Sequence, residues 1–311
     1  MKKCIPVGVG ILMLAFTASL AAIDVVSDFS TNPLTTGGWS FGVGSNANSQ
    51  LAWSQPTSSL HVHLDSSLPT VRLDLPIGTT LTTGTDFTLS ARFSFTITSA
   101  PNNEGMQLAF GLVNHAITGG NRTGTPANFG SDNVFNTVEF NYFPNVSPQF
   151  GSGRTLTPAV FGAQIPGSDA FGNFASVFGS GSDLGDNVSP AVTELPQSTL
   201  LQATLNYAAS TKTLTLVMQR VNGDLSLTTL ETSVPPLNLS LISPAFAVDS
   251  LAIMAYQDGF NGDPFSSPLV ALVADMDIHQ IGVSAPAPEP ASTLLLLSAG
   301  GVLALFRRRR A

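Results

Sequence analysis

Apolar and polar residues alternate over long stretches between residues 23 and 285. The run FTLSARFSFTI (87–97) is the clearest case, because successive side chains of a strand point to opposite faces. Residues 201–221 form two β-rich runs about a turn at Ala209-Ser210-Thr211, and residues 250–257 and 268–283 resemble further strands. We find no amphipathic helical pattern in this body. The pattern therefore predicts an all-β fold, an antiparallel β-sandwich or jelly roll.

The middle of the body departs from this alternation. Residues 150–187 are rich in Gly, Ser and Phe-Gly pairs without a fixed period. We predict a long excursion with one short strand around Thr157–Ala163, whose phenylalanines fold back to cap the sandwich or, alternatively, form an exposed contact patch.

The chain ends with an uncharged apolar run that is followed by four arginines. Residues 291–306 carry no charge, and as a helix they would span roughly 24 Å. The long side chains of Arg307, Arg308, Arg309 and Arg310 can make up part of the difference from the ~30 Å of a bilayer core. Their charges also oppose burial of the run as a core helix. We predict a transmembrane anchor at 291–306 with the arginines on the cytoplasmic side.

The first 22 residues have the order of a secretory leader. Lys2 and Lys3 precede an apolar stretch from Ile5 to Phe16, and small residues follow up to Ala22. We predict a signal peptide over residues 1–22 that signal peptidase removes, with an uncleaved anchor as the alternative. The single cysteine, Cys4, lies in this leader, so the mature chain would contain no disulfide.

Together these terminal features resemble the PEP-CTERM sorting signal of Gram-negative bacteria. The motif residues are Pro288, Glu289 and Pro290, within a terminal segment of 284–311. The resemblance implies transient insertion in the inner membrane, processing by an exosortase, and delivery to the cell surface or an exopolysaccharide matrix. The same segment is also labelled an ice-binding-protein C-terminal domain. Ice binding would need regularly spaced threonines on a flat face, and the sequence has no such repeat.

Charge narrows the range of partners. The two leading lysines and four terminal arginines supply six of the 12 basic residues, and Glu289 supplies one of the 20 acidic residues. The body therefore carries a formal charge of −13, against −8 for the whole chain. An acidic surface of this kind opposes binding to nucleic acid.

Three segments of the body resemble legume lectins, the concanavalin-like sandwich family. They are 93–114, 136–145 with Glu-Phe-Asn-Tyr-Phe-Pro-Asn, and 202–218 with Asn206-Tyr207 and Lys212-Thr213-Leu214. The resemblance implies one concanavalin-like domain over residues 23–283. It also implies that Glu139, Asn141 and Asn145 occupy positions that bind calcium and a transition metal in that family. Asn141 replaces a bridging carboxylate, and no Asp or His follows within residues 146–150. The family's pair of metals, a single calcium ion and no metal at all therefore stay open.

Other polar groups offer weaker candidates. Asp258, Asn261 and Asp263 lie on one Gly-broken loop that could bind calcium or a sugar hydroxyl, with ordinary turn hydrogen bonds as the alternative. His61 and His63 share a strand face, but a metal site needs further ligands that the sequence does not identify, so we predict a solvated edge. Few aromatic residues could stack on sugars, and of these we expect Tyr207 and one tryptophan in the core.

Two functions of different classes follow, and catalysis is not expected. The first is an exported surface or matrix protein whose sandwich binds exopolysaccharide. The second is a structural surface or matrix protein without a specific ligand. A glycoside-active enzyme is the weakest alternative, because the Glu139 segment lacks the paired carboxylates of sandwich glucanases and no nucleophile elbow is present.

Overall fold

The computed structural model describes most of the β-rich body. The described ranges are 22–42, 45–65, 71–99, 106–115, 136–146, 153–161, 174–176, 179–180, 196–230, 236–239, 246–257 and 273–287. Within these ranges all seventeen regular elements are strands, and residues Ile23–Ala285 form one compact unit. No helix of this part of the chain is long and apolar enough to cross a membrane. The predicted leader, the anchor at 291–306, Pro288–Pro290 and Arg307–Arg310 lie outside the described residues.

The first of two antiparallel sheets has nine strands, and most of them come from the two ends and the later middle of the body. Its order is β14 (Leu227–Thr229), β13 (Thr213–Val221), β12 (Leu201–Ala208), β6 (Phe87–Ser99), β17 (Val273–Ala285), β4 (Ser59–Asp65) and β3 (Leu51–Ser54). In addition β1 (Ile23–Ser27) pairs with β17, and β15 (Leu237–Asn238) pairs with β13. The last strand of the body thus lies in the middle of this sheet, between β6 and β4.

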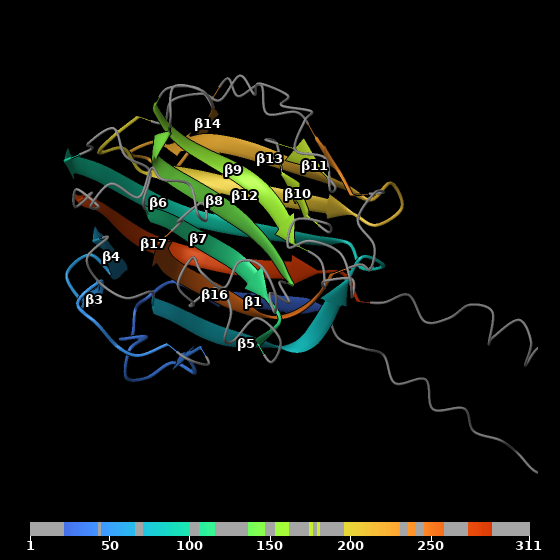
Figure 1. The fold of residues 1–311 in the computed structure, drawn as a ribbon, viewed down its shortest axis with the longest axis horizontal. Coiled ribbons are helices and arrows are strands. Elements are labelled where there is room, and N and C mark those ends of the chain that lie inside the picture. Colours follow the sequence, from blue (N-terminus) through green and yellow to red (C-terminus); the bar gives the residue numbers. More distant parts are fainter. Residues whose placement is uncertain are drawn as a thin grey trace, which may run out of the picture. The chain divides into compact units, whose positions relative to one another are not determined.

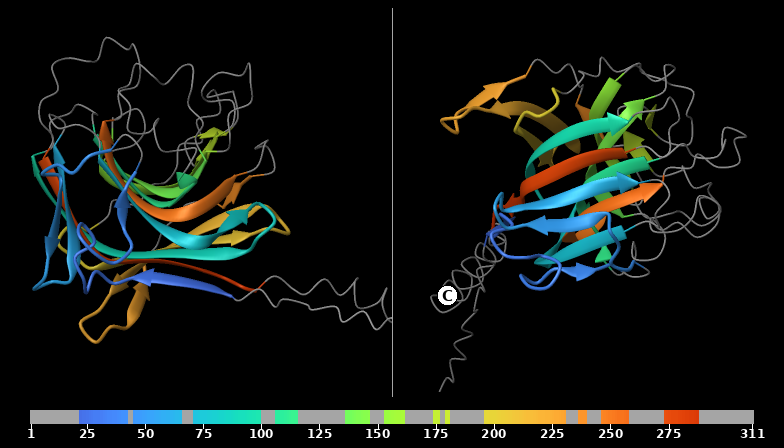
Figure 2. Two further views of the ribbon diagram at one scale, coloured as in Figure 1. Left: turned by 90° about the horizontal axis from the view of Figure 1, so that it is seen from below. Right: turned by 90° about the vertical axis from the view of Figure 1, so that its left-hand side faces the viewer.

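The second sheet has eight strands and is visibly curved (Figure 2). Its order is β11 (Gly179–Ser180), β10 (Phe174–Ser176), β9 (Gly153–Phe161), β8 (Thr137–Val146), β7 (Met106–Val113), β16 (Ala247–Gln257), β5 (Val71–Thr82) and β2 (Ser40–Phe41). Figure 1 shows β7, β8 and β9 as successive green strands, with β16 between β7 and β5. The sheet therefore joins strands that are far apart in the sequence.

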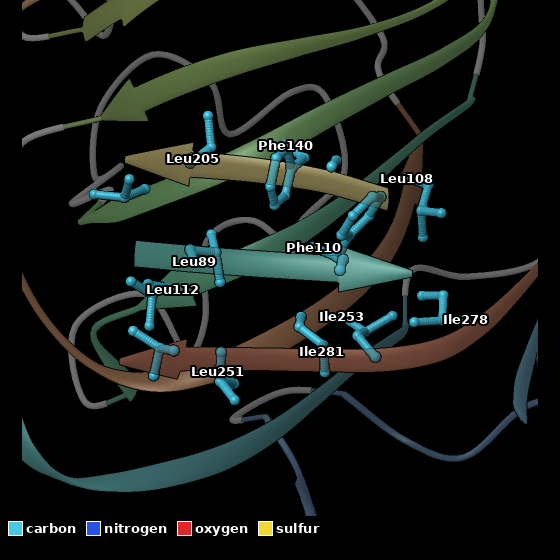
Figure 3. Packing of buried hydrophobic residues seen from close by; sticks show 14 of the residues in the cluster. Leu89, Leu108, Phe110, Leu112, Phe140, Leu205, Leu251, Ile253, Ile278 and Ile281 are labelled. Atoms are coloured by element: carbon cyan, nitrogen blue, oxygen red, sulfur yellow. The ribbon is translucent and has the colours of Figure 1, made fainter. Parts of the chain in front are cut away.

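The hydrophobic core lies between the two sheets. Figure 3 shows Phe110 and Phe140 of the eight-stranded sheet beside Leu89 and Leu205 of the nine-stranded sheet. The rings of Phe93 and Phe110 cross the interface with centroids 5.5 Å apart. Alternate residues of the longer strands supply this core, and the all-β, antiparallel prediction is confirmed.

Several individual strands also agree with the sequence pattern. The run at 87–97 is β6, and residues 201–221 form the β12–β13 hairpin. Tyr207 belongs to the core, where it stacks on Phe87, so it cannot stack on a sugar. Only one short strand was expected within 150–187, but the described residues of this stretch form three, β9, β10 and β11. Strand β9 is longer than expected and begins at Gly153. Its apolar residues Leu156 and Val160 lie on the buried face, a pattern that the high Gly and Ser content of the stretch conceals.

Candidate functional site

The curved sheet has a second buried face, turned away from the main core. Because side chains alternate along strands, Arg72 and Asp74 of β5 point to this face while Val71 and Leu73 enter the core. We call it the outer face of the eight-stranded sheet. Ala109, Val113, Ala252 and Met254 form a separate small hydrophobic cluster on it. It is therefore a second, packed layer rather than an open strand surface.

Glu139, which the sequence singled out, lies at the centre of this outer face. The sheet register aligns it with Gly111 of β7, Ala252 of β16 and Asp74 of β5. Its side chain is completely buried. A β-carbon on Gly111 would lie 2.4 Å from the carbonyl oxygen of Val138, so this position accepts only glycine without a shift of the backbone. Two carboxylates thus lie on one row of the sheet, separated by two positions with small residues.

Asp74 is held by two basic side chains. It accepts hydrogen bonds from Nε and Nη2 of Arg72, the first at 2.7 Å, and its Oδ2 lies 2.7 Å from Nδ1 of His115. Arg72 and Asp74 are fully buried, whereas the His115 side chain is 40 % exposed. The backbone N–H of His115 donates to Asp249, which fixes the start of the segment that follows β7. The imidazole therefore connects a buried ion pair to the solvent.

The guanidinium of Arg72 is also covered by the chain that follows β2. A β-carbon on Gly42 would lie 2.3 Å from Nε of Arg72, so the chain after β2 passes directly over the guanidinium. Within the described residues, Nη1 of Arg72 is buried and has no hydrogen-bond partner. Burial of an incompletely satisfied cation is costly, so the pairing with Asp74 is the interaction that makes this arrangement tolerable.

The remaining predicted site residues divide into two groups. Asn141 is placed by the register of β8, opposite Ala109 and Thr157, and Asn145 belongs to the same strand, but their side chains are outside the described residues. Asp258, Asn261 and Asp263 lie outside the described ranges altogether. A calcium site at either place stays a prediction. Sequence reasoning missed Arg72, Asp74 and His115; the signal was the pair of charges, two residues apart, in the otherwise apolar run VRLDL.

The prediction for His61 and His63 is wrong in one respect. Their strand, β4, is not an edge, because β3 pairs with it on one side and β17 on the other. The two imidazoles lie on the outer face of the nine-stranded sheet opposite Asp277 and Asp275 of β17. Nδ1 of His61 is 3.0 Å from Oδ1 of Asp277, and Nδ1 of His63 is 2.6 Å from Oδ1 of Asp275. They form a paired cluster instead of a solvated edge.

This pairing changes the protonation of His61 in the metal-free protein. The hydrogen bond to Asp277 and the charges of Asp277 and Asp275 raise the pKa of His61 above its usual 6.5, although partial burial acts in the opposite direction. The hydrogen bond from His61 also lowers the pKa of Asp277 below 3.8, assisted by the charge of His279. Both shifts favour the ion pair.

We expect the imidazole NMR signals of His61 to titrate above pH 6.5 in protein treated with a chelator, and the Asp277→Asn variant to lower that midpoint. The contribution of His61 to stability is complete below pH 6.5 and is lost as the pH rises through its folded-state pKa. The contribution of Asp277 is present above about pH 4 and is lost as the pH falls through its own lowered pKa. An unchanged midpoint in the variant would contradict the pairing.

Comparisons with known proteins concern the fold. The sequence matches no family model and no curated protein. Solved structures similar to this chain are legume lectins and related carbohydrate-recognition domains. A winged bean acidic lectin complexed with methyl-α-D-galactose has 13 % identity and a TM-score of 0.48, covering 86 % of this chain and 100 % of its own. A Lotus tetragonolobus seed lectin has 12 % identity and a TM-score of 0.45, with the same two coverages. The carbohydrate recognition domain of Emp47p has 12 % identity and a TM-score of 0.41, covering 88 % of this chain and 97 % of its own.

Proposed function

We propose that this chain is an exported surface or matrix protein that binds exopolysaccharide at the rim of the outer face of its eight-stranded sheet, through the segments that adjoin this face. The leader at 1–22 and the terminal Pro-Glu-Pro, apolar and arginine elements support export, exosortase processing and delivery to the surface. The acidic charge of the body supports an uncharged or cation-bridged polysaccharide as ligand over an anionic polymer.

One observation carries the binding part of the proposal. The outer face of the eight-stranded sheet is buried, yet it carries Asp74, Glu139 and Arg72 where packing alone would select apolar side chains. Asp74 and Glu139 are buried in one row with Ala252 and Gly111, so they act by fixing the strands whose ends and adjoining segments form the rim where a sugar or a bridging cation would bind. Glu139 lies where the lectin resemblance places a ligand-binding carboxylate.

The spacing of the two acids supports binding over glycoside hydrolysis. Asp74 and Glu139 are on β5 and β8, and β16 and β7 lie between them. Three inter-strand spacings of ~4.8 Å separate them by about 14 Å. Pairs of carboxylates that hydrolyse glycosides are about 5 to 9.5 Å apart. Backbone positions this far apart, together with the complete burial of both side chains, argue against action on one glycosidic bond, so we propose no enzymatic activity.

Binding of the full chain to the extracellular polysaccharide of its own host tests the proposal. The measurement is made with calcium and then with EDTA, and it is repeated with Glu139→Gln. Asp224→Asn, in the exposed turn before β14, is the matched control because it makes the same carboxylate-to-amide change away from the face. We expect Glu139→Gln to weaken binding at least tenfold and the control to leave it unchanged. No binding by the parent chain would instead support the structural matrix protein without a ligand.

A further inference from the structure

The paired cluster on the opposite sheet has the composition of a transition-metal site. His61 and His63 alternate on β4, and the register sets them opposite Asp277 and Asp275 of β17. Val62 and Met276, which alternate with these residues, and Leu60 before His61 are fully buried in the core. The strand backbones and their core contacts therefore fix where the four polar side chains emerge from the sheet.

The ligand atoms converge on one carboxylate. Oδ1 of Asp275 lies 2.6 Å from Nδ1 of His63 and 3.3 Å from Nε2 of His61. One donor atom from each of these three residues lies within 4.8 Å of the others. Tetrahedral ligands at ~2.0–2.1 Å from a zinc ion stand about 3.3 Å apart. Rotations of the side chains are enough to bring three donors to one ion, without movement of the strands.

A fourth side chain orients one of these donors. Asp277 is 3.0 Å from Nδ1 of His61, and it is the hydrogen-bond acceptor that fixes this nitrogen as the protonated one. Nε2 of His61 then carries the lone pair that can coordinate a metal ion, and it is the nitrogen directed at Asp275. A carboxylate that holds the second nitrogen of a metal-bound imidazole is a common supporting contact, because it fixes the tautomer and the ring orientation.

Access and chemistry indicate which ion fits. The side chains of His61, His63 and Asp275 are 35 %, 33 % and 30 % exposed, so an ion can enter and water can complete its coordination. Two imidazoles and one carboxylate suit Zn²⁺ or a similar divalent transition metal. Ca²⁺ and Mg²⁺ prefer sets of oxygen ligands.

We propose that His61, His63 and Asp275 bind a divalent transition metal ion, with Zn²⁺ the best match, and that Asp277 positions His61. The site lies on the nine-stranded sheet, so it is independent of the polysaccharide site proposed on the other sheet. An ion bound here would tie the last strand of the body to β4, and its exposed coordination position would be open to a ligand from solvent or from another molecule.

Titration of the metal-free full chain with Zn²⁺, and with Co²⁺ as a spectroscopic probe, tests this proposal. Cys4→Ser serves as the background, because it removes the only thiol in the sequence. We expect one ion per chain with a micromolar or tighter dissociation constant, d–d absorption from Co²⁺, and no displacement by millimolar Ca²⁺ or Mg²⁺. The absence of binding at 100 µM Zn²⁺ overturns the proposal.

Three further variants assign the ligands. His61→Gln combined with His63→Gln should weaken binding more than about 100-fold. Asp277→Asn should weaken it about 10- to 100-fold, since it removes the orienting contact while all three ligands stay. His279→Gln is the matched control, a third histidine of the same surface that supplies no ligand, and should change the affinity less than twofold. Metal-free melting curves check that the variants are folded. Binding that survives the double variant, or is lost in His279→Gln, contradicts the assignment.

Discussion

Replacement of Asp74 by Asn is expected to destabilise the protein by about 3–5 kcal/mol, the effect of removing one partner from a buried ion pair. Both side chains are fully buried, and Asp74 receives two hydrogen bonds from the Arg72 guanidinium. Asparagine keeps the shape of the side chain and removes its charge. The cation of Arg72 then stays buried beneath Gly42 without the carboxylate with which it pairs.

Urea denaturation of the purified variant measures this effect, and two controls define its cause. The double change of Arg72→Met with Asp74→Leu removes both charges, and it should recover most of the lost stability, because apolar replacements of buried pairs are often neutral. His115→Gln should have a much smaller effect than Asp74→Asn, because the imidazole of His115 is 40 % exposed and Asp74 still pairs with Arg72 in that variant. If the double variant is as unstable as Asp74→Asn, the penalty comes from lost packing or lost hydrogen bonds and the charge explanation fails.

The buried pair of Arg72 and Asp74 also shows what the sequence pattern can and cannot predict. Alternation identified β6 and the β12–β13 hairpin because each has one apolar face and one polar face. Where the central strands of the eight-stranded sheet are described, both faces are buried, so period-two alternation no longer separates core from solvent. In VRLDL the charged positions would be assigned to solvent by that rule, but the structure buries them.

The His61 and His63 cluster was beyond sequence reasoning for a different reason. The two imidazoles share a face by simple alternation, which the sequence shows. Their carboxylate partners are on β17, and His61 and Asp277 are separated by 216 positions in the chain. Only the register of β4 against β17 brings these groups together, and register depends on the long-range packing of the whole sheet. In contrast Glu139 was singled out from the sequence, because its short motif is local to one strand, and its role in binding stays a prediction.

Replacement of Phe110 by Ala is expected to lower the free energy of unfolding by about 3–5 kcal/mol, the usual range for loss of a buried aromatic ring. Phe110 is fully buried and connects the two layers of the sandwich. Its ring centroid is 5.5 Å from that of Phe93 on the nine-stranded sheet and 5.1 Å from that of Phe140 on the neighbouring strand β8. Figure 3 shows Phe110 beside Phe140 among the aliphatic side chains. Alanine would remove contacts to both sheets at once and leave a cavity that strand pairing on both sides prevents from closing.

Urea denaturation again provides the measurement, with Phe110→Leu as the matched control. Leucine fills part of the space and should therefore cost substantially less than alanine. Val26→Ala, on the exposed side of β1, should have little effect, because Val26 is 51 % exposed. Equal losses for the alanine and leucine variants would show that the ring contacts with Phe93 and Phe140 contribute the stability. A loss below about 1 kcal/mol for alanine would show that the two sheets move together and fill the cavity. The interface between them would then repack more easily than its buried phenylalanines imply.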